Sequence, residues 1–260
     1  MRQTEKAPPH PTLNKTMPNM KTILITGSNS AVGIAVAKAL AAYPVKLALH
    51  YHSNQNKADQ LQVWMNENGV TSHFFRCDLT VPAQAQQLVA DTVRHFGSLD
   101  ILINIVGPYV HQNILQVTPE QWLNDINLNL HTCFHTSHYA LPALRQNQGQ
   151  IINFAFAGVE NNKAWPDSTA YCAAKTAVVA LSKSLAVALA PEKVRVNIIC
   201  PGLVDDEDIN AVERQQMASQ IPLGRPVHAN EIGQTVSWLI WNSPAAMTGA
   251  LLSVAGAWEY

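Results

Sequence analysis

"KTILITGSNSAVGIAVAKAL" (residues 21–40) passes from a β-branched run, through a turn with two glycines, into a stretch whose apolar residues have helical spacing. This order predicts a strand at 21–26, a tight turn at Gly27 and a helix over 31–43. Gly33 would let that helix pack closely on the strand, and the helix N-terminus would offer free N–H groups to a pyrophosphate. A plain strand-to-helix turn is the competing interpretation.

The same alternation of apolar runs and helical patterns continues along the chain. Six further strands are predicted, at 45–51, 71–77, 99–104, 150–156, 194–200 and 250–254, and helices at 56–69, 82–97, from Thr118 onward and at 168–190. Such alternation is typical of an α/β fold, here a Rossmann-type doubly wound parallel sheet of about seven strands with helices on both faces. We expect one such domain over residues 21–260, with ligands beyond the carboxyl ends of its strands. Residues 1–20, polar and proline-bearing, are expected to form a disordered tail.

Composition excludes several classes of function. Of the 260 residues, 47% are hydrophobic and 13% charged, with a formal net charge of −1. The charge gives no attraction to nucleic acid or to a membrane surface, and the low charge density favours a homotetramer or homodimer. No apolar run reaches the roughly 20 residues of a membrane span, and no secretory signal is recognisable. The four cysteines are widely separated (Cys77, Cys133, Cys172 and Cys200), which predicts reduced thiols and a cytoplasmic protein.

A tyrosine and a lysine stand four residues apart in "YCAAK" (171–175). This spacing places Tyr171 and Lys175 on the same face of a helix. A nearby ammonium lowers the pKa of a phenol, so Tyr171 would be a usable proton donor to a carbonyl. A chance pair on a solvated helix is the alternative.

Several ordered motifs resemble the classical short-chain dehydrogenase/reductase family, over residues 20–260. "TGSNSAVG" is similar to the family's TGxxxGxG, "ILINIVG" to its NNAG strand end and "YCAAK" to its YxxxK. "CDLT" resembles the segment that contacts adenine, "WLNDINLNL" carries the helix asparagine as Asn129, and "CPG" resembles the turn beside the nicotinamide. The C-terminal part is closest in pattern to bacterial 3-oxoacyl-carrier-protein reductases.

The resemblance implies an oxidoreductase that reduces a ketone, either 3-oxoacyl-type or another small carbonyl and possibly an acyl thioester, with NADP(H). Tyr171 would give the proton, Lys175 would lower the tyrosine pKa and hold the nicotinamide ribose, and Asn129 would hold a water that links Lys175 to solvent. Asp78 would bind the adenine amine, and Asn104 and Gly107 would line the adenosine ribose. The implied cofactor-binding set is Gly27, Ser28, Asn29, Ser30, Val32, Gly33, His52, Ser53, Asp78, Leu79, Asn104, Val106, Gly107, Tyr171, Lys175, Pro201, Gly202 and Val204.

The loop after the second strand bears on the choice of cofactor. "HYHSN" (50–54) has no carboxylate, which would repel a 2′-phosphate, and it has His52 and Ser53 as donors. This favours NADP(H), with NAD(H) as the alternative. "LHYHSN" also resembles the pterin-type reductases of the family, which are a second candidate. A weakly catalytic NAD(P)-binding sensor or subunit is the third.

The chain departs from the family pattern at three places. Ala31 replaces the middle glycine of the phosphate turn, and Ile105 and Val106 replace Asn and Ala. The family's catalytic serine falls on Gly158 when counted back from the tyrosine, or on Phe156 when aligned on "IIN", and neither has a hydroxyl. A backbone N–H near Ala157 or Gly158 is a hypothetical substitute, since losing one donor costs about 2–4 kcal/mol of transition-state stabilisation.

Aromatic residues surround this position in the sequence. Phe156, Gly158, Trp165 and Tyr109 are expected to line the substrate pocket, with packing in the core as the alternative, and Asp167 or Ser168 to cap the following helix. His131, His135 and His138 share a helix face and indicate a subunit interface rather than a metal site. The run "DDED" (205–208) is expected to be a solvated helix start in the segment that covers substrate, so no metal site is predicted.

Overall fold

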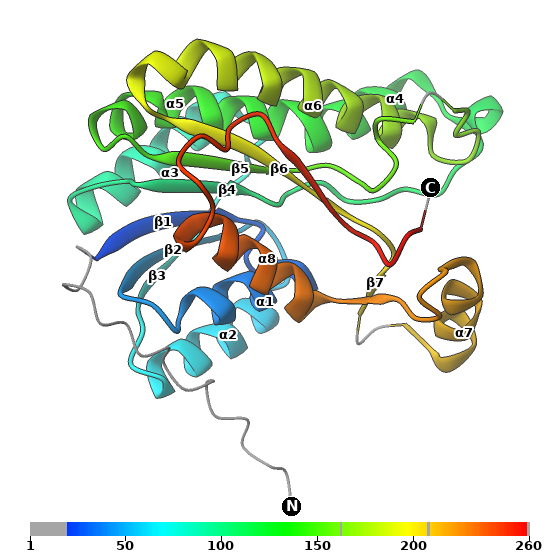
Figure 1. Cartoon of the computed structure of the whole chain (residues 1–260), viewed down its shortest axis with the longest axis horizontal. Helices are drawn as coiled ribbons and strands as arrows, with labels where there is room; N and C mark the ends of the chain where they lie inside the picture. The colour runs from blue at the N-terminus through cyan, green and yellow to red at the C-terminus, as the bar shows by residue number, and fades with distance from the viewer. Residues whose placement is uncertain (1–19, 162, 207–208, 259–260) are drawn as a thin grey trace, which may run out of the picture.

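A single parallel sheet forms the centre of the molecule (Figure 1). The computed structural model describes residues 20–161, 163–206 and 209–258. The predicted tail, residues 1–20, falls outside this part except for Met20. The seven sheet strands, in the spatial order β3-β2-β1-β4-β5-β6-β9, all pair in parallel. Their bounds are β1 Lys21–Thr26, β2 Val45–Tyr51, β3 Thr71–Arg76, β4 Ile101–Asn104, β5 Gln150–Phe154, β6 Arg195–Pro201 and β9 Leu251–Val254. The predicted doubly wound fold is confirmed.

Helices cover both faces of the sheet (Figure 1). One layer holds α1 Ala31–Leu40, α2 Gln55–Glu67 and α8 Ala229–Trp241, and the other holds α3 Pro82–Phe96, α4 Pro119–Ile126, α5 Thr132–Gln146 and α6 Thr169–Leu189. Successive side chains of a strand point to opposite faces, so β1 feeds both cores. Ile23 and Ile25 pack among the residues of α1 and α8, whereas Leu24 packs among those of α3 and α5.

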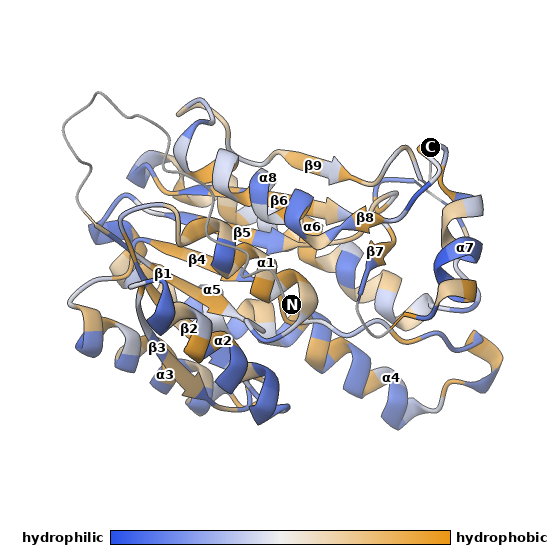
Figure 2. Cartoon of the chain, turned by 90° about the horizontal axis from the view of Figure 1, so that it is seen from below, coloured by the Kyte–Doolittle hydropathy of each residue, from blue (hydrophilic) through white to orange (hydrophobic). Residues whose placement is uncertain are grey.

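Hydropathy follows this layering (Figure 2). The sheet strands are hydrophobic, and many outward-facing helix residues are hydrophilic. Leu24, Leu47, Leu102 and Ile151 have no exposed surface. Burial on both faces explains why these strands are nearly continuous apolar runs in the sequence.

Local sequence signals set several helix ends. Thr118 and Gln121 form a reciprocal capping box at the start of α4, as the Thr-Pro pair predicts. Gly97 ends α3 with a φ of +84°, a backbone conformation that glycine adopts without strain. Between α4 and α5 the chain forms one π-helical turn, η2 Asn127–His131. Such insertions are frequent at functional sites.

Four elements near the C-terminal end were not given bounds from the sequence. They are the helices α7 Ala211–Gln220 and α8 Ala229–Trp241 and the short paired strands β7 Val204–Asp205 and β8 Val227–His228. Figure 1 shows α7 at one end of the molecule, apart from the two main layers. Not one α7 residue is fully buried, so its sequence has no apolar stripe from which a helix could be inferred.

The helix α6, with the turn that follows it, corrects the expectation about apolar runs. Thr169–Glu192 is, within the described residues, the one helix long and apolar enough to cross a membrane, with a mean hydropathy of 1.5 over its most apolar window. Here α6 packs on β5 and β6, with Val178, Ser182 and Leu189 buried. Its apolar composition fits a core helix of the sheet layer.

Candidate active site

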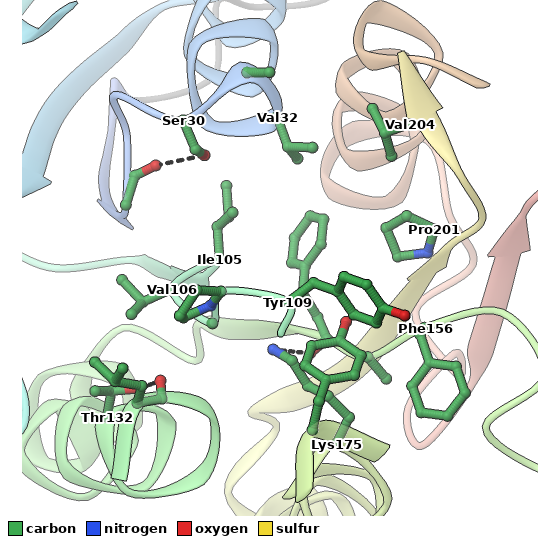
Figure 3. Close-up of a pocket in the computed structure, with 18 of the residues that line it drawn as sticks. Ser30, Val32, Ile105, Val106, Tyr109, Thr132, Phe156, Lys175, Pro201 and Val204 are labelled. Atoms are coloured by element: carbon green, nitrogen blue, oxygen red, sulfur yellow. Dashed lines mark hydrogen bonds between the residues drawn. The ribbon is translucent and has the colours of Figure 1, made fainter. Parts of the chain in front are cut away.

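A cavity of about 840 Å³ lies beyond the carboxyl ends of β1, β4, β5 and β6. The chain leaves β1 toward β2 on one side and later returns to β4 on the other. This switch in strand order opens a crevice where ligands bind in doubly wound sheets. Figure 3 shows the labelled side chains of the cavity, from Ser30 and Val32 at one end to Phe156 and Lys175 at the other.

The turn after β1 is built to approach a ligand with its backbone. Gly27 has a φ of +66°, and the Ser30 hydroxyl accepts from the Gly33 N–H at 3.1 Å, which caps α1. A side chain at Gly33 would collide with the backbone of Gly27 and Ser28. Ser28 is fully buried, and its hydroxyl donates to the His50 carbonyl at 3.0 Å. Ser28 and Gly33 therefore shape the turn from behind, whereas Gly27, Asn29, Ser30 and Val32 line the cavity.

Two of the sequence departures are accommodated at this turn. A Cβ at Gly27 would lie 3.2 Å from Val106 Cγ2, so the missing side chain of Gly27 makes room for the larger residue at 106. Ala31 lines the cavity and begins α1. With Ala31 and Val106 in place, Ser30 still caps α1 and Gly27 keeps its positive φ.

His50 connects the phosphate turn to the segment after β3, a role the sequence did not suggest. The Gly27 N–H donates to His50 Nδ1 at 3.2 Å, so the ring carries its proton on Nε2, which faces the Cys77 carbonyl at 3.1 Å. Burial lowers the His50 pKa to about 4. The neutral imidazole thus holds Gly27 beside the loop that carries Asp78.

The residues predicted to bind adenosine after β2 and β3 line one part of the cavity. Asp78 accepts from the hydroxyl and the N–H of Thr80 at 2.7 and 2.9 Å, and these bonds lower its pKa. His52 and Ser53 line the cavity, as do Asp78 and Leu79. Arg76, which was not predicted, donates from Nε to the His52 carbonyl at 3.2 Å and places a cation beside this loop.

Asn104 does not face the cavity, which corrects its predicted role at the ribose. Its amide nitrogen donates to Ser137 at 3.1 Å and to Asn153 at 2.9 Å, and its oxygen accepts from Thr136 at 2.7 Å. The side chain is 4% exposed. Asn104 therefore joins β4 to β5 and α5, because its hydrogen-bonding groups are satisfied inside the fold.

Lys175, Asn129 and Gly107 converge on one point of the cavity floor. Lys175 is 3% exposed and donates from Nζ to the Phe154 carbonyl at 3.1 Å. Burial lowers its pKa to about 8. A Cβ at Gly107 would collide with both Lys175 Nζ and Asn129 Oδ1, so the ammonium and the amide oxygen both lie where a side chain at this position would stand.

The Asn129 amide is held by two bonds and leaves its oxygen available. Its nitrogen donates to the carbonyls of Pro108 and Asp125, both at 3.2 Å, from within the π-helical turn η2. Its buried Oδ1 has no hydrogen-bond partner. A buried polar atom without a partner is uncommon and indicates a place for a water or a ligand. Asn129 itself does not line the cavity, but Lys175 and Gly107 do.

Tyr171 lies above this point, surrounded by other aromatic rings. Its ring is edge-on to Tyr109, with centroids 5.1 Å apart, and the Lys175 Nζ lies 5.9 Å from its centroid. Burial raises the Tyr171 pKa above its ordinary value. The four-residue spacing predicted a lowered pKa. The direction differs because desolvation outweighs the attraction of an ammonium that donates to the Phe154 carbonyl.

Phe156, and not Gly158, lies where β5 opens into the cavity. Phe156 is 6% exposed and packs edge-on against Trp165, with centroids 5.2 Å apart. Gly158 has a φ of +83° and belongs to a turn that does not line the cavity. The Ala157 N–H donates to the Pro201 carbonyl at 2.8 Å. Because this N–H already has a partner, Ala157 is not available as the hypothetical backbone donor to the substrate. The prediction of Gly158 as a pocket residue is also wrong, since Gly158 does not line the cavity.

The cavity contains residues that sequence reasoning missed. Thr80 and Ile105 stand inside "CDLT" and "ILINIVG" but were not assigned to the site, and Ser168 was expected only as a helix cap. Others come from the segment around α7 and from the C-terminal part, where the only signal was the general resemblance to the family: Met217, Gln220 and Trp258. Pro201, Gly202 and Val204, predicted from "CPG", line the cavity beside them.

The histidine face of α5 makes contacts within the protein. His131 Nδ1 lies 2.7 Å from Asn127 Oδ1, His135 Nδ1 lies 3.0 Å from the Leu79 carbonyl, and His138 stacks on Phe134. Over the described parts of the chain, no three histidine, cysteine, aspartate or glutamate side chains are placed to hold a metal ion. The expected helix start at the acidic run is wrong: Asp205 belongs to β7 and pairs with Arg214 at 2.8 Å, and the next helix begins at Ala211 with Asn210 as its cap. Residues 207–208 lie outside the described residues.

The chain is similar to known proteins over most of its length. The family described as enoyl-(acyl carrier protein) reductase matches residues 27–257. A 3-oxoacyl-(acyl-carrier-protein) reductase of Staphylococcus aureus is 30% identical over 241 residues, 91% of this chain and 97% of the relative. D-beta-hydroxybutyrate dehydrogenase of Rhizobium meliloti is 30% identical over 259 residues, 92% of this chain and 98% of the relative.

Solved structures show the same fold. A short-chain dehydrogenase/reductase from Serratia marcescens superposes with a TM-score of 0.86 at 26% identity, covering 92% of this chain and 98% of the neighbour. A variant of the actinorhodin polyketide ketoreductase, solved with NADPH, superposes with a TM-score of 0.85 at 26% identity, covering 93% and 98%.

Proposed function

The chain belongs to the short-chain dehydrogenase/reductase family, and on this premise we propose that it is an NADPH-dependent ketone reductase with Tyr171 as proton donor. As a member, it is an oxidoreductase that interconverts C=O and CH–OH with a nicotinamide cofactor. The observation that carries the proposal is the convergence of Lys175, Asn129 Oδ1 and Gly107 beneath the Tyr171 ring. The Tyr171 phenol is thus close to the buried Lys175 ammonium and to Asn129 Oδ1, which can accept a hydrogen bond.

The described residues fit a dinucleotide. The capped turn at Gly27 would hold the pyrophosphate, Asp78 and Leu79 the adenine, and Gly107 the ribose beside Lys175. When bound, the nicotinamide supplies a hydride to the carbonyl carbon. Support for the 2′-phosphate of NADPH comes from the loop after β2, which has no carboxylate and has the Arg76 guanidinium against its backbone.

Tyr171, Lys175 and Asn129 would carry out the proton transfer. Because burial raises the Tyr171 pKa, the phenol is protonated near neutral pH, which is the state a proton donor needs. Tyr171 would donate from its hydroxyl to the carbonyl oxygen of the substrate. Lys175, whose pKa is lowered to about 8, would return a proton to the phenolate through a water held at Asn129 Oδ1.

The substrate end of the cavity is aromatic. Phe156, Trp165 and Tyr109 surround Tyr171, with Met217 and Trp258 on the side of α7. These side chains favour a ketone that carries an apolar substituent. Together with the names of the relatives, they support a 3-oxoacyl-type or other small carbonyl substrate. The pterin-type alternative is less favoured, because that branch has an aspartate where β5 ends and this chain has Phe156.

We extend the proposal to organisation and location. Phe134 on α5 is 46% exposed, and Val187 on the neighbouring α6 is 78% exposed. These apolar side chains support a homo-oligomer, a dimer or tetramer, that buries the outer faces of α5 and α6. Residues 21–260 would form the reductase domain and residues 1–20 a tail. The protein would work in the cytoplasm, where its four cysteines, free in the structure, stay reduced.

A binding titration followed by a turnover assay tests the function. NADPH fluorescence would be titrated with the protein, and NADPH oxidation would then be followed with a panel of ketones that includes acetoacetyl thioesters. The proposal predicts saturable binding and turnover of at least one apolar ketone. Binding without turnover on the whole panel would favour a cofactor-binding sensor or subunit, and absence of NADPH and NADH binding would contradict the assignment.

A further inference from the structure

The substrate carbonyl needs a second hydrogen-bond donor besides Tyr171. Phe156 occupies the end of β5 and has no hydroxyl, and the Ala157 N–H is bonded to the Pro201 carbonyl. Around the substrate end, the cavity-lining side-chain hydroxyls among the described residues belong to Tyr109, Ser168 and Tyr171. Tyr109 is 60% exposed, whereas Ser168 is 8% exposed. Only Ser168 therefore offers a second hydroxyl that is shielded from water.

Ser168 occupies the N-cap position of α6 but does not cap the helix. A serine at this position ordinarily accepts from a backbone N–H in the first turn. Here its side chain makes no such bond, and its hydroxyl lies 3.5 Å from Cys172 Sγ, a weak partner. A buried hydroxyl with so weak a bond is costly unless something else binds it. Ser168 lines the cavity, where a ligand could supply a stronger partner.

The backbone around Ser168 is fixed from several directions. Its N–H donates to the Trp165 carbonyl at 3.2 Å, and its carbonyl accepts from the Cys172 N–H at 3.0 Å. The two preceding residues are tied to the loop after β4: the Gln112 N–H donates to Asp167 and the Ile114 N–H to Pro166, both at 2.7 Å. A hydroxyl on so constrained a segment keeps its direction, as a preorganised donor must.

Ser168 also shares a helix face with the proton donor. Residues three apart on a helix are neighbours, so Ser168 lies one turn before Tyr171 on the side that faces the cavity. Phe156, Trp165 and Cys172 pack together with Tyr171 in one cluster, and all of them line the cavity. Ser168 and Tyr171 thus line the same cavity from positions one turn apart at the start of α6.

We propose that the Ser168 hydroxyl donates a hydrogen bond to the substrate carbonyl oxygen, together with Tyr171, in place of a hydroxyl at the end of β5. Ser168 keeps its own proton throughout, whereas the Tyr171 proton is transferred to the carbonyl oxygen as the carbon is reduced. The ligand class is a ketone whose apolar part lies against Phe156 and Trp165. This inference rests on the proposed reductase function.

The test compares three changes at or near Ser168. S168A removes the hydroxyl, S168T keeps one, and F156S/S168A places a hydroxyl at the end of β5 instead. Losing one preorganised donor lowers kcat by about 10²-fold to 10³-fold, so S168A is expected to fall in that range with KM changed much less. S168T and F156S/S168A are expected to recover part of the loss. T176A, whose hydroxyl donates to the Cys172 carbonyl on the same helix, is the matched control and is expected to keep full activity.

NADPH binding by fluorescence separates this role from a structural one. All variants are expected to bind NADPH with the wild-type Kd, because Ser168 lies at the substrate end of the cavity. Wild-type kcat in S168A would overturn the proposal, and so would a loss that S168T does not restore or that T176A shares. Failure of the wild-type protein to reduce any ketone would instead contradict the proposed function itself.

Discussion

At the scale of single residues, Lys175 has the largest electrostatic consequence. Its ammonium is buried, and desolvation lowers its pKa from 10.5 to about 8. The unfolded chain therefore binds more protons than the folded one between these two values. A buried charge of this kind destabilises the fold fully below pH 8, and the penalty disappears as pH rises from 8 through 10.5. The site keeps Lys175 despite this cost, as expected for a group that works on protons.

Replacing Lys175 with methionine tests this cost. The free energy of unfolding of the wild-type protein should gain roughly 2–3 kcal/mol relative to that of K175M as pH rises from 7 to 10.5. Urea denaturation of both proteins at the two pH values measures the difference, in which titrations common to both proteins cancel. A difference that does not change with pH would show that the ammonium is not buried.

Gly107 provides a second test at the residue scale. A methyl group in G107A would collide with Lys175 Nζ and Asn129 Oδ1, so we expect NADPH affinity and kcat/KM each to fall by at least about tenfold, equivalent to about 1.4 kcal/mol. G69A is the control, because Gly69 also has a positive φ of +66° but no atom within 4 Å of the added Cβ. If G69A impaired binding as much as G107A, backbone strain rather than the collision would be the cause.

Ser168 and Asn104 show why single-residue roles were hard to predict. Both stand in motifs from which a role could be assigned, as a helix cap and as a ribose contact. The structure gives Asn104 three bonds inside the fold and leaves Ser168 without a cap bond. Which bond a polar side chain makes depends on partners distant in sequence, such as Asn153 for Asn104, and spacing does not reveal these partners.

At the scale of elements, the phosphate turn depends on a histidine in the neighbouring strand. Burial lowers the His50 pKa to about 4, and the ring accepts a hydrogen bond from the Gly27 N–H only when it is neutral. The Nε2 of the His50 ring faces the Cys77 carbonyl, and the charged groups that act on this ring are His52 and Asp78. Protonation would place an N–H opposite the Gly27 N–H and push the turn away.

Acid should therefore loosen this turn. Because the folded pKa of His50 lies below the ordinary 6.5, unfolding free energy falls as pH drops from 6.5 to 4, by up to roughly 3 kcal/mol. NADPH affinity should weaken over the same range in the wild-type protein. H50N, which keeps an acceptor but does not titrate, should lose this pH dependence, and H111N, at an exposed histidine, should keep it. A wild-type Kd that is flat from pH 6.5 to 4.5 would contradict the role of His50.

The strands were predictable because their sequences must satisfy two buried faces. The predicted 21–26 and 45–51 agree with β1 and β2, since a parallel sheet between helix layers needs continuous apolar runs. The fifth strand ends at Phe154 rather than Phe156, because its register with β6 ends at Ile199. By contrast, α7 has no buried residue and β7 is two residues long, so tertiary contacts rather than periodicity define them.

At the scale of the whole molecule, the cavity follows from the topology. Parallel strands place the ends of β1, β4, β5 and β6 at one edge, so Gly27, Gly107, Phe156 and Pro201 meet although they are distant in sequence. The ordered motifs predicted this meeting, because most of them stand at the end of a strand or near the start of a helix. No motif at a strand end or helix start predicts Met217, Gln220 and Trp258, which line the cavity as well.

The outer face of α5 leads to a prediction about assembly. Phe134 is half-exposed and stacks on His138, with ring centroids 5.7 Å apart. If a second copy covers this face, F134E should convert the oligomer to a smaller species in light scattering, because it would bury a carboxylate in an apolar contact. V63E on α2, where Val63 is 55% exposed on another face, should leave the assembly unchanged. A wild-type protein that is monomeric at all concentrations would contradict the prediction.

The direct test of Tyr171 as proton donor is the turnover of Y171F beside its NADPH binding. Phenylalanine keeps the ring contacts with Tyr109 and Phe156 and removes only the hydroxyl. General acid catalysis contributes about 10²-fold to 10⁴-fold to a rate. We predict that Y171F binds NADPH with the wild-type Kd and reduces the best ketone substrate with kcat lowered by that factor. Turnover equal to that of the wild-type protein would contradict the account.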